Sequence, residues 1–142
     1  MNMECNWGLM NTDPLTDLLA DKQELDRRTL ATILTPYAKL DKNTGQVMFT
    51  PSFTKLTNSG KILIFLLARK AAKNLSLPLD HEEASPTEIS NQTGVNYDSV
   101  KPTVSQLYKG RLLTKSGNSY YVPDHALLTA RELIEKKSER GG

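Results

Sequence analysis

The most apolar stretch of the chain, KILIFLLARKAAKNL between residues 61 and 75, limits the folds that this sequence can adopt. Two capping residues, Asn58 and Ser59, precede it. Apolar side chains recur within it at Ile62, Leu63, Phe65, Leu66, Ala72 and Leu75. A helix that is apolar around most of its circumference must be buried on most sides. The sequence therefore predicts a central helix, beginning near residue 58, around which the other elements pack.

The composition is that of one domain with short extensions. The chain has 142 residues, of which 38% are hydrophobic but only 6% are aromatic. The core must therefore consist mainly of Leu, Ile and Val. This favours an α+β fold that is mainly helical over a β-sandwich.

Cysteine content and hydropathy indicate the compartment. The single cysteine, Cys5, excludes an intramolecular disulfide and a Cys-rich zinc site, and it favours a reducing compartment. The longest apolar run, Ile62 to Ala68, is about a third of the roughly 20 residues that span a membrane. The first residues lack the pattern of a signal peptide. We therefore expect a soluble, cytoplasmic protein with no membrane partner.

Residues 1–55 are predicted to form an N-terminal extension. Asp13 is a capping residue before a proline, and the leucine-rich segment Pro14 to Leu34 follows until Pro36 stops it. This segment is either one interrupted helix or two short ones. Next, Asn43-Thr44-Gly45 has the composition of a turn, so we expect a small β-hairpin from Ala38 to Leu40 and from Gln46 to Phe49. An ordered loop is the alternative.

Two short helices are predicted after the central helix. Ser85-Pro86-Thr87-Glu88 is a capping box with proline at the first helical position, and Gly94 ends the helix that it starts. A second helix ends at Gly110 and carries apolar residues at Val100, Val104 and Leu107. Two short helices joined by a tight turn form a helix-turn-helix.

Pro102 lies within the second of these helices, where a proline costs about 3 kcal/mol. The cost disappears if Ser99 is the cap, because Pro102 is then the third helical position, where no N–H has a partner within the helix. The alternative is a helix from Asn96 that kinks at the proline. We favour the later start, which leaves Asp98 in the turn.

A second short hairpin and a last helix complete the predicted elements. Leu112 to Lys115 and Tyr120 to Val122 are strand-like and flank the turn Ser116-Gly117-Asn118. Asp124 is expected to cap an amphipathic helix that extends to Lys137, followed by a disordered tail. Residues 125–142 therefore form a C-terminal segment.

The region from Thr87 to Val122 resembles the winged helix-turn-helix DNA-binding superfamily, in particular bacterial and archaeal regulators. The matching residues are Glu88, Ile89, Thr93, Gly94, Val100, Val104, Leu107, Gly110, Leu112 and Leu113. This resemblance implies a winged-helix domain over residues 56–124, and no specific family is recognised for residues 1–55. Ser90 departs from the usual Ala, and Asp98 places an acid close to where phosphates would lie.

The resemblance implies that the second helix enters the major groove of double-stranded DNA. Rotation at 100° per residue puts Val100, Val104 and Leu107 on the core face, and polar residues on the opposite face. The predicted DNA-binding residues are Tyr97, Ser99, Lys101, Pro102, Thr103, Ser105, Gln106, Lys109, Arg111, Lys115 and Asn118. The alternative for each is an ordinary solvated residue.

The charge of the predicted domain suggests a dimer. Residues 56–124 carry eight Lys and Arg against six Asp and Glu, so one protomer would make few phosphate contacts and bind weakly at physiological salt. Two amphipathic segments could join protomers, Pro14 to Leu34 and Asp124 to Lys137. The alternative is that both pack on their own domain.

The leading functional hypothesis is a dimeric, sequence-specific DNA-binding protein that regulates transcription. The alternatives are a plasmid- or phage-type DNA-organising protein and a winged-helix module that binds proteins rather than DNA. No Gly-rich phosphate loop or catalytic constellation is present, so we expect no enzyme activity. Residues 80–83, DHEE, are interpreted as a solvated loop because adjacent residues cannot all face one ion. No metal or cofactor is expected.

Overall fold

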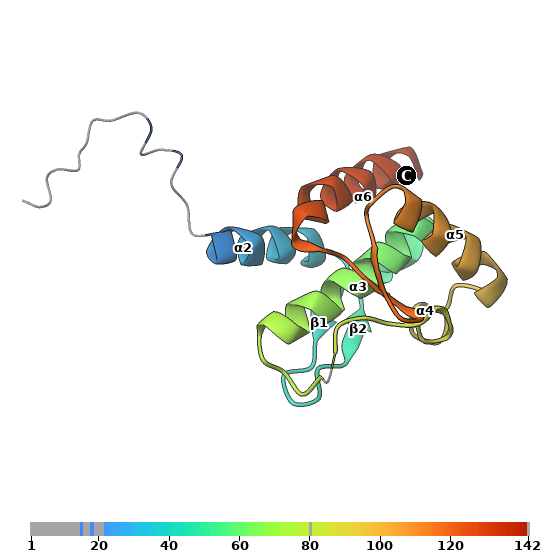
Figure 1. The fold of residues 1–142 in the computed structure, drawn as a ribbon, viewed down its shortest axis with the longest axis horizontal. Helices are drawn as coiled ribbons and strands as arrows, with labels where there is room; N and C mark the ends of the chain where they lie inside the picture. Colours follow the sequence, from blue (N-terminus) through green and yellow to red (C-terminus); the bar gives the residue numbers. More distant parts are fainter. Residues whose placement is uncertain (1–14, 16–17, 19–21, 80, 142) are drawn as a thin grey trace, which may run out of the picture.

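The computed structural model describes residues 15, 18, 22–79 and 81–141 (Figure 1). The first half of the segment predicted as an N-terminal helix, and Cys5, thus lie mostly or wholly outside the described residues. The described part is α+β and mostly helical, with two small antiparallel hairpins. This confirms the predicted fold class at that level.

The helix α3 (Asn58–Asn74) is the centre of the fold, as the sequence predicted. Residues 62–70 are all buried, and α3 contacts α2, α4, α5, α6 and strands of both hairpins (Figure 1). The predicted cap was wrong, because Thr57 rather than Asn58 or Ser59 caps the helix. The Thr57 side chain accepts a hydrogen bond from the Gly60 N–H, at 3.2 Å.

The N-terminal elements are the helix α2 (Lys22–Leu34) and a hairpin of β1 (Ala38–Leu40) and β2 (Val47–Phe49). The strands pair antiparallel with Ala38 opposite Phe49, so the hairpin prediction is confirmed. Gly45 in the connecting turn has a φ of +78°, a backbone conformation that favours glycine. A short 3-10 helix, η3 (Pro51–Lys55), leads to α3.

The helix α4 (Pro86–Thr93) has the predicted bounds. The Ser85 hydroxyl accepts from the Glu88 N–H at 3.2 Å, and Gly94 ends the helix in the left-handed conformation at a φ of +80°. The Glu88 carboxylate, however, bonds the Arg69 guanidinium at 2.8 Å. Of the two hydrogen bonds of a capping box, only the one from the Glu88 N–H to the Ser85 hydroxyl is present. The Glu88 carboxylate instead joins α4 to α3 through Arg69.

The helix α5 (Tyr97–Lys109) begins earlier than predicted. The Asn96 side chain caps it by accepting from the Asp98 N–H at 2.8 Å, so the prediction of Ser99 as the cap was wrong. Pro102 lies inside the helix and has no N–H to donate to the Asp98 carbonyl. The favourable cap and the burial of three apolar side chains, Val100, Val104 and Leu107, offset the cost of the proline.

The second hairpin, β3 (Thr114–Ser116) and β4 (Ser119–Tyr121), confirms the prediction but lies closer to the turn than the predicted strands, Leu112 to Lys115 and Tyr120 to Val122. Ser116 pairs with Ser119, so the turn is Gly117-Asn118 alone. An isolated bridge joins Tyr120 to Ala84, with N–H to carbonyl distances of 2.9 and 3.0 Å. The segment before α4 is therefore hydrogen bonded to the hairpin that follows α5.

Asp124 does not cap the last helix, contrary to the prediction. A 3-10 turn, η4 (Asp124–Ala126), precedes α6 (Leu127–Gly141) and shows no side-chain cap. The Asp124 carboxylate instead pairs with Lys70 at 2.7 Å and with Lys22 at 3.4 Å. The backbone of α6 continues to Gly141, where the sequence predicted a disordered tail.

The helices proposed for dimerisation pack on their own protomer. Leu30 and Ile33 of α2, together with Ala130 and Ile134 of α6, belong to the same buried core as α3. Leu25 and Leu128 remain exposed on the two helices. The described part of the chain thus shares one core, and the boundaries predicted at residues 55 and 124 stay predictions.

Two cations of α3 are buried and paired. Arg69 donates to Glu88 and to the carbonyls of His81 and Glu83, at 2.8 to 3.2 Å. Its neighbour Lys70 is 6% exposed and pairs with Asp124 at 2.7 Å and with Glu82 at 3.6 Å. Both were counted among the positive charges of the predicted domain, but burial and pairing remove them from any surface that binds a polyanion.

Replacing Pro102 with Ala tests the position of the helix start. We expect the free energy of unfolding to rise by about 2 kcal/mol, because about 3 kcal/mol of interior-proline cost is removed and about 1 kcal/mol of unfolded-chain restriction is lost. Urea denaturation measures the difference. Pro86→Ala is the control: at the first helical position of α4 only the restriction is lost, so stability falls slightly. No gain from Pro102→Ala would contradict the early helix start.

Replacing Asp124 with Asn tests the ion pair with Lys70. The hydrogen bond from Lys70 lowers the pKa of the Asp124 carboxyl below its usual 3.8. A lowered pKa in the folded state gives stability that is present above the usual value and lost as pH falls through the lowered one. Because the side chain is 52% exposed, we expect Asp124→Asn to cost at most about 1 kcal/mol at neutral pH.

In urea denaturation, this difference should shrink as the pH falls below about 5 and should vanish once the pH lies below the lowered pKa. Glu132→Gln is the matched control, because Glu132 is exposed on the adjacent helix and has no ion pair among the described residues. A constant difference for Asp124→Asn at every pH would exclude the ion pair as its cause.

Candidate nucleic-acid interface

The outward face of α5 carries the residues that rotation of the sequence placed there. Val100, Val104 and Leu107 face the core. The opposite side presents four exposed residues, Asp98, Pro102, Gln106 and Lys109, beside a half-buried Ser105. These side chains are thus available to a partner, and their role in contacting DNA stays a prediction.

Two predicted contact residues are less available. Ser99 and Thr103 are half-buried on the side of α5 away from Lys101. The Thr103 hydroxyl donates to the Ser99 carbonyl at 2.7 Å. Thr103 therefore uses its only side-chain donor within its own helix, and it retains only acceptor capacity for a partner.

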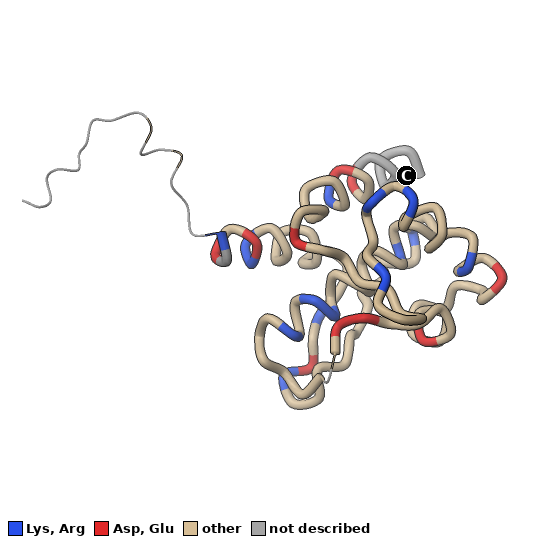
Figure 2. The backbone as a smooth tube through the Cα atoms, viewed as in Figure 1, with Lys and Arg blue, Asp and Glu red and all other residues tan. Residues whose placement is uncertain are grey.

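Four exposed cations lie on α5 and on the chain that follows it. They are Lys101, Lys109, Arg111 and Lys115, and none of them forms an ion pair with another described residue. Figure 2 shows their blue segments on α5 and the following hairpin, with one red segment at the start of the helix. Outside this surface, five cations are paired with acids: Lys22, Arg28, Arg69, Lys70 and Arg131. Five others also form no ion pair with a described residue, but they lie on other elements: Arg27, Lys39, Lys42, Lys55 and Lys61. We call the four residues the unpaired basic surface.

Aromatic rings support two of these cations. The Lys101 ammonium lies 5.8 Å from the centre of the Tyr97 ring, and the Lys115 ammonium lies 5.9 Å from that of Tyr120. Tyr108 contacts Tyr120 edge to face at 6.2 Å between ring centres, which joins α5 to the hairpin. Tyr108 is exposed and was missed as a candidate. Helical rotation places it on the same side as Tyr97 and Lys101, so the sequence contained the signal.

Arg111 holds a backbone conformation that favours glycine. Its φ is +67°, and it follows the end of α5. The Arg111 N–H donates to the Tyr108 carbonyl at 3.0 Å, and the Leu112 N–H donates to the Leu107 carbonyl at 2.9 Å. This is the Schellman pattern, in which Gly usually occupies the left-handed position. The chain thus keeps a charged side chain where a glycine would be less strained.

The tip of the second hairpin is exposed and polar. Lys115 and Asn118 are exposed, and Asn118 occupies the second position of a two-residue turn. Gly117 precedes it with a φ of +61°, as a type II′ turn requires at its first position. The end of the hairpin therefore exposes a lysine and an asparagine to solvent.

Asp98 is the exception to the positive charge of this face. The early start of α5 puts it in the first helical turn, where an acid interacts favourably with the helix dipole. It is exposed and forms no ion pair with another described residue. Asp98 therefore lies beside Pro102 on the outward face, rather than in the preceding turn as predicted.

Residues 22–79 and 81–141 contain neither a metal-binding cluster nor a membrane-spanning helix. No group of three or more His, Cys, Asp or Glu in this part of the chain could hold a metal ion. No described helix is both long and apolar enough to cross a bilayer. His81, from the predicted solvated loop, lies 2.9 Å from the Glu83 carbonyl through its Nδ1.

Comparison with protein-family models, characterised proteins and solved structures finds no match to this chain.

Replacing Arg111 with Gly tests the strain at the end of α5. We expect the free energy of unfolding to rise by about 1 kcal/mol, because glycine adopts a positive φ without the steric cost of a side chain. Ser76 is a matched control, since it has a φ of +59° at the corresponding place after α3. Ser76→Gly should stabilise by a similar amount in thermal denaturation. Destabilisation by Arg111→Gly would mean that the Arg111 side chain makes a stabilising contact.

Proposed function

We propose that residues 56–124 form a winged helix-turn-helix and that the protein binds double-stranded DNA as a regulator of transcription. The observation that carries the proposal is the unpaired basic surface, Lys101, Lys109, Arg111 and Lys115, on α5 and the segment after it. Cations that are not neutralised by the protein's own acids are available to phosphates. This chemistry favours binding over catalysis.

The order of the elements supports the same proposal. After the buried helix α3, the bridged residue Ala84, the helices α4 and α5, and the hairpin β3–β4 follow in turn. The sequence resemblance to winged-helix regulators covers this region, and in that superfamily the second helix of the pair enters the major groove. We therefore assign α5 as the recognition helix.

Within this proposal the residues divide by chemistry. Gln106 and Ser105 can hydrogen bond base edges, because an amide or a hydroxyl both donates and accepts. Lys109 extends from the same face toward a base or a phosphate. Arg111 and Lys115 flank the helix and reach phosphates, whose contacts position the protein without reading sequence.

We also propose that the protein acts as a homodimer. The unpaired basic surface has few cations per protomer, so a second protomer is needed for tight binding at physiological salt. Most apolar residues of α2 and α6 are used within the protomer. The exposed Leu25 and Leu128 are the ones available to a dimer interface.

The second candidate function is a winged-helix module that binds proteins. Asp98 favours it, because an exposed acid on the outward face of α5 repels phosphates. A DNA-organising protein would use the same surface as a regulator, so sequence preference rather than affinity separates those two roles.

A salt titration of binding to a duplex DNA library tests the proposal. From about 50 to 200 mM salt, the affinity should fall with a log–log slope of about −0.9 for each phosphate contact, which is about −7.2 for the eight cations of a bound dimer and about −3.6 for a single protomer. Lys109→Ala removes one cation from each protomer, so it should reduce the slope of the dimer by about 1.8 and weaken all sequences alike, whereas Gln106→Ala should relax sequence preference. Asp98→Asn should tighten binding severalfold at low salt.

Arg111→Gly and Lys42→Ala sharpen this test. Arg111→Gly should weaken DNA binding although the fold becomes more stable, which separates binding from folding. Lys42 lies in the turn of the first hairpin, away from α5 (Figure 1), so Lys42→Ala should leave binding unchanged. Sedimentation of the complex should give two protomers per duplex. No binding at about 50 mM salt would refute the DNA proposal and leave the protein-binding module.

A further inference from the structure

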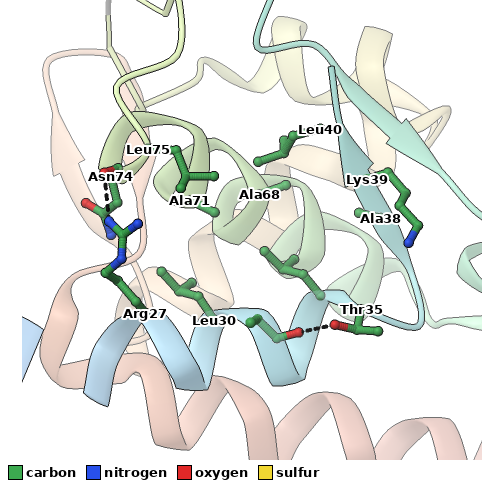
Figure 3. Close-up of a pocket in the computed structure, with 12 residues that line it drawn as sticks. Arg27, Leu30, Thr35, Ala38, Lys39, Leu40, Ala68, Ala71, Asn74 and Leu75 are labelled. Carbon is green, nitrogen blue, oxygen red and sulfur yellow. Dashed lines mark hydrogen bonds between the residues drawn. The ribbon is translucent and has the colours of Figure 1, made fainter. Parts of the chain in front are cut away.

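An apolar groove lies between α2, α3 and β1, on elements other than α5 and the second hairpin. Its volume is about 440 Å³, and its walls include Leu30, Leu34 and Ala68, all buried, and the half-buried Leu40. Figure 3 shows these elements around the groove, with Leu75 at the rim. Leu75 is 50% exposed although the sequence placed it on the apolar stripe of the central helix.

Small side chains keep this groove open. Ala31, Ala38, Ala68 and Ala71 all line it and come from three different elements. Larger apolar residues at these positions would fill the space, as protein cores normally do. An apolar surface that is concave and left unfilled is the usual form of a small-molecule site.

Arg27 lies at one end of the groove, and its guanidinium has N–H donors that are not used by the described part of the chain. The Arg27 guanidinium donates one hydrogen bond, from Nη1 to the Asn74 carbonyl, at 2.9 Å. It forms no ion pair with another described residue. Figure 3 shows Arg27 and Asn74 together at one end of the groove, and Thr35 and Lys39 at the other. Arg27 thus places a planar guanidinium, with N–H donors that remain available, at one end of an apolar groove.

We propose that this groove binds a small molecule with an apolar body and a carboxylate. The apolar body lies against Leu30, Leu34 and Ala71, and the carboxylate pairs with the guanidinium of Arg27. The planar fork of donors in Arg matches the two oxygens of a carboxylate. The ligand is thus a short fatty acid or an aryl-alkyl acid.

The size of the groove selects this occupant. About 440 Å³ lies at the lower end of the roughly 300–1,000 Å³ range of small-molecule pockets. A protein interface, by comparison, buries about 800 Å² on each partner and would extend far beyond these residues. The charged residues that line the groove, Arg27 and Lys39, are both positive. A ligand with an anionic end is therefore complementary to the groove, and a ligand with a cationic end is not.

Titration of the full chain with straight-chain carboxylates by calorimetry tests this proposal. Hexanoate, heptanoate and octanoate, each below its micelle-forming concentration, should bind with one molecule per protomer. Affinity should rise about fourfold for each added CH₂ until the groove is filled. Octanol, which has the same chain length but no carboxylate, should bind at least about tenfold more weakly than octanoate.

Three variants locate the site. Ala71→Leu fills the groove and should abolish octanoate binding while the protein stays folded by circular dichroism. Arg27→Gln should weaken octanoate about tenfold and leave octanol unchanged. Arg28→Gln is the matched control on the same helix, because Arg28 is exposed and pairs with Glu24, and it should change nothing.

The opposite results would overturn the proposal. Octanoate binding that survives Ala71→Leu would place the ligand elsewhere, and equal binding of octanol and octanoate would remove Arg27 from the site. No binding of any carboxylate would exclude a fatty-acid site. A dimer that octanoate dissociates would assign the groove to a second copy of the chain. None of these results depends on DNA binding, so this proposal stands or fails separately.

Discussion

The position of α4 and of the segment before it depends on one buried guanidinium. Arg69 extends from α3 and binds the Glu88 carboxylate of α4 together with the carbonyls of His81 and Glu83. The segment that it holds contains Ala84, which pairs with Tyr120 of the second hairpin. A charge therefore joins α4 to α3 in addition to apolar contacts, whereas α5 packs on both helices through apolar side chains. Removing a buried charge from such a set leaves its acid unpaired.

Local chemistry predicted the elements whose ends are marked by turn and cap residues. The first hairpin and α4 follow directly from Gly45, Ser85 and Gly94, since each of these residues favours one backbone conformation. The outward face of α5 was also predictable, because Val100 and its apolar neighbours define the core side by spacing alone. The start of α5 was not, because the cost of Pro102 competes with a cap and with burial, and only the folded protein shows which of them is larger.

Contacts between residues far apart in the chain could not be predicted from the sequence. Lys70 lies beside Asp124 although the two are far apart in the chain, and so Asp124 is used in an ion pair instead of a helix cap. The groove near Arg27 needs α2, α3 and β1 together, and no single segment carries a sign of it. Spacing rules describe one element at a time, whereas these features arise where elements meet.

If α5 is the recognition helix, as proposed, the short second hairpin would limit the length of DNA that one protomer contacts. A strand of three residues, such as β3, extends only about 10 Å, which is less than the roughly 12 Å width of a major groove. In a complex of that kind, a hairpin of this length would lie beside the groove that α5 enters rather than extend into the next minor groove. The bases that one protomer contacts would then lie in a single groove. A longer target would have to be a repeat, with the symmetry of the repeat set by the symmetry of the protein.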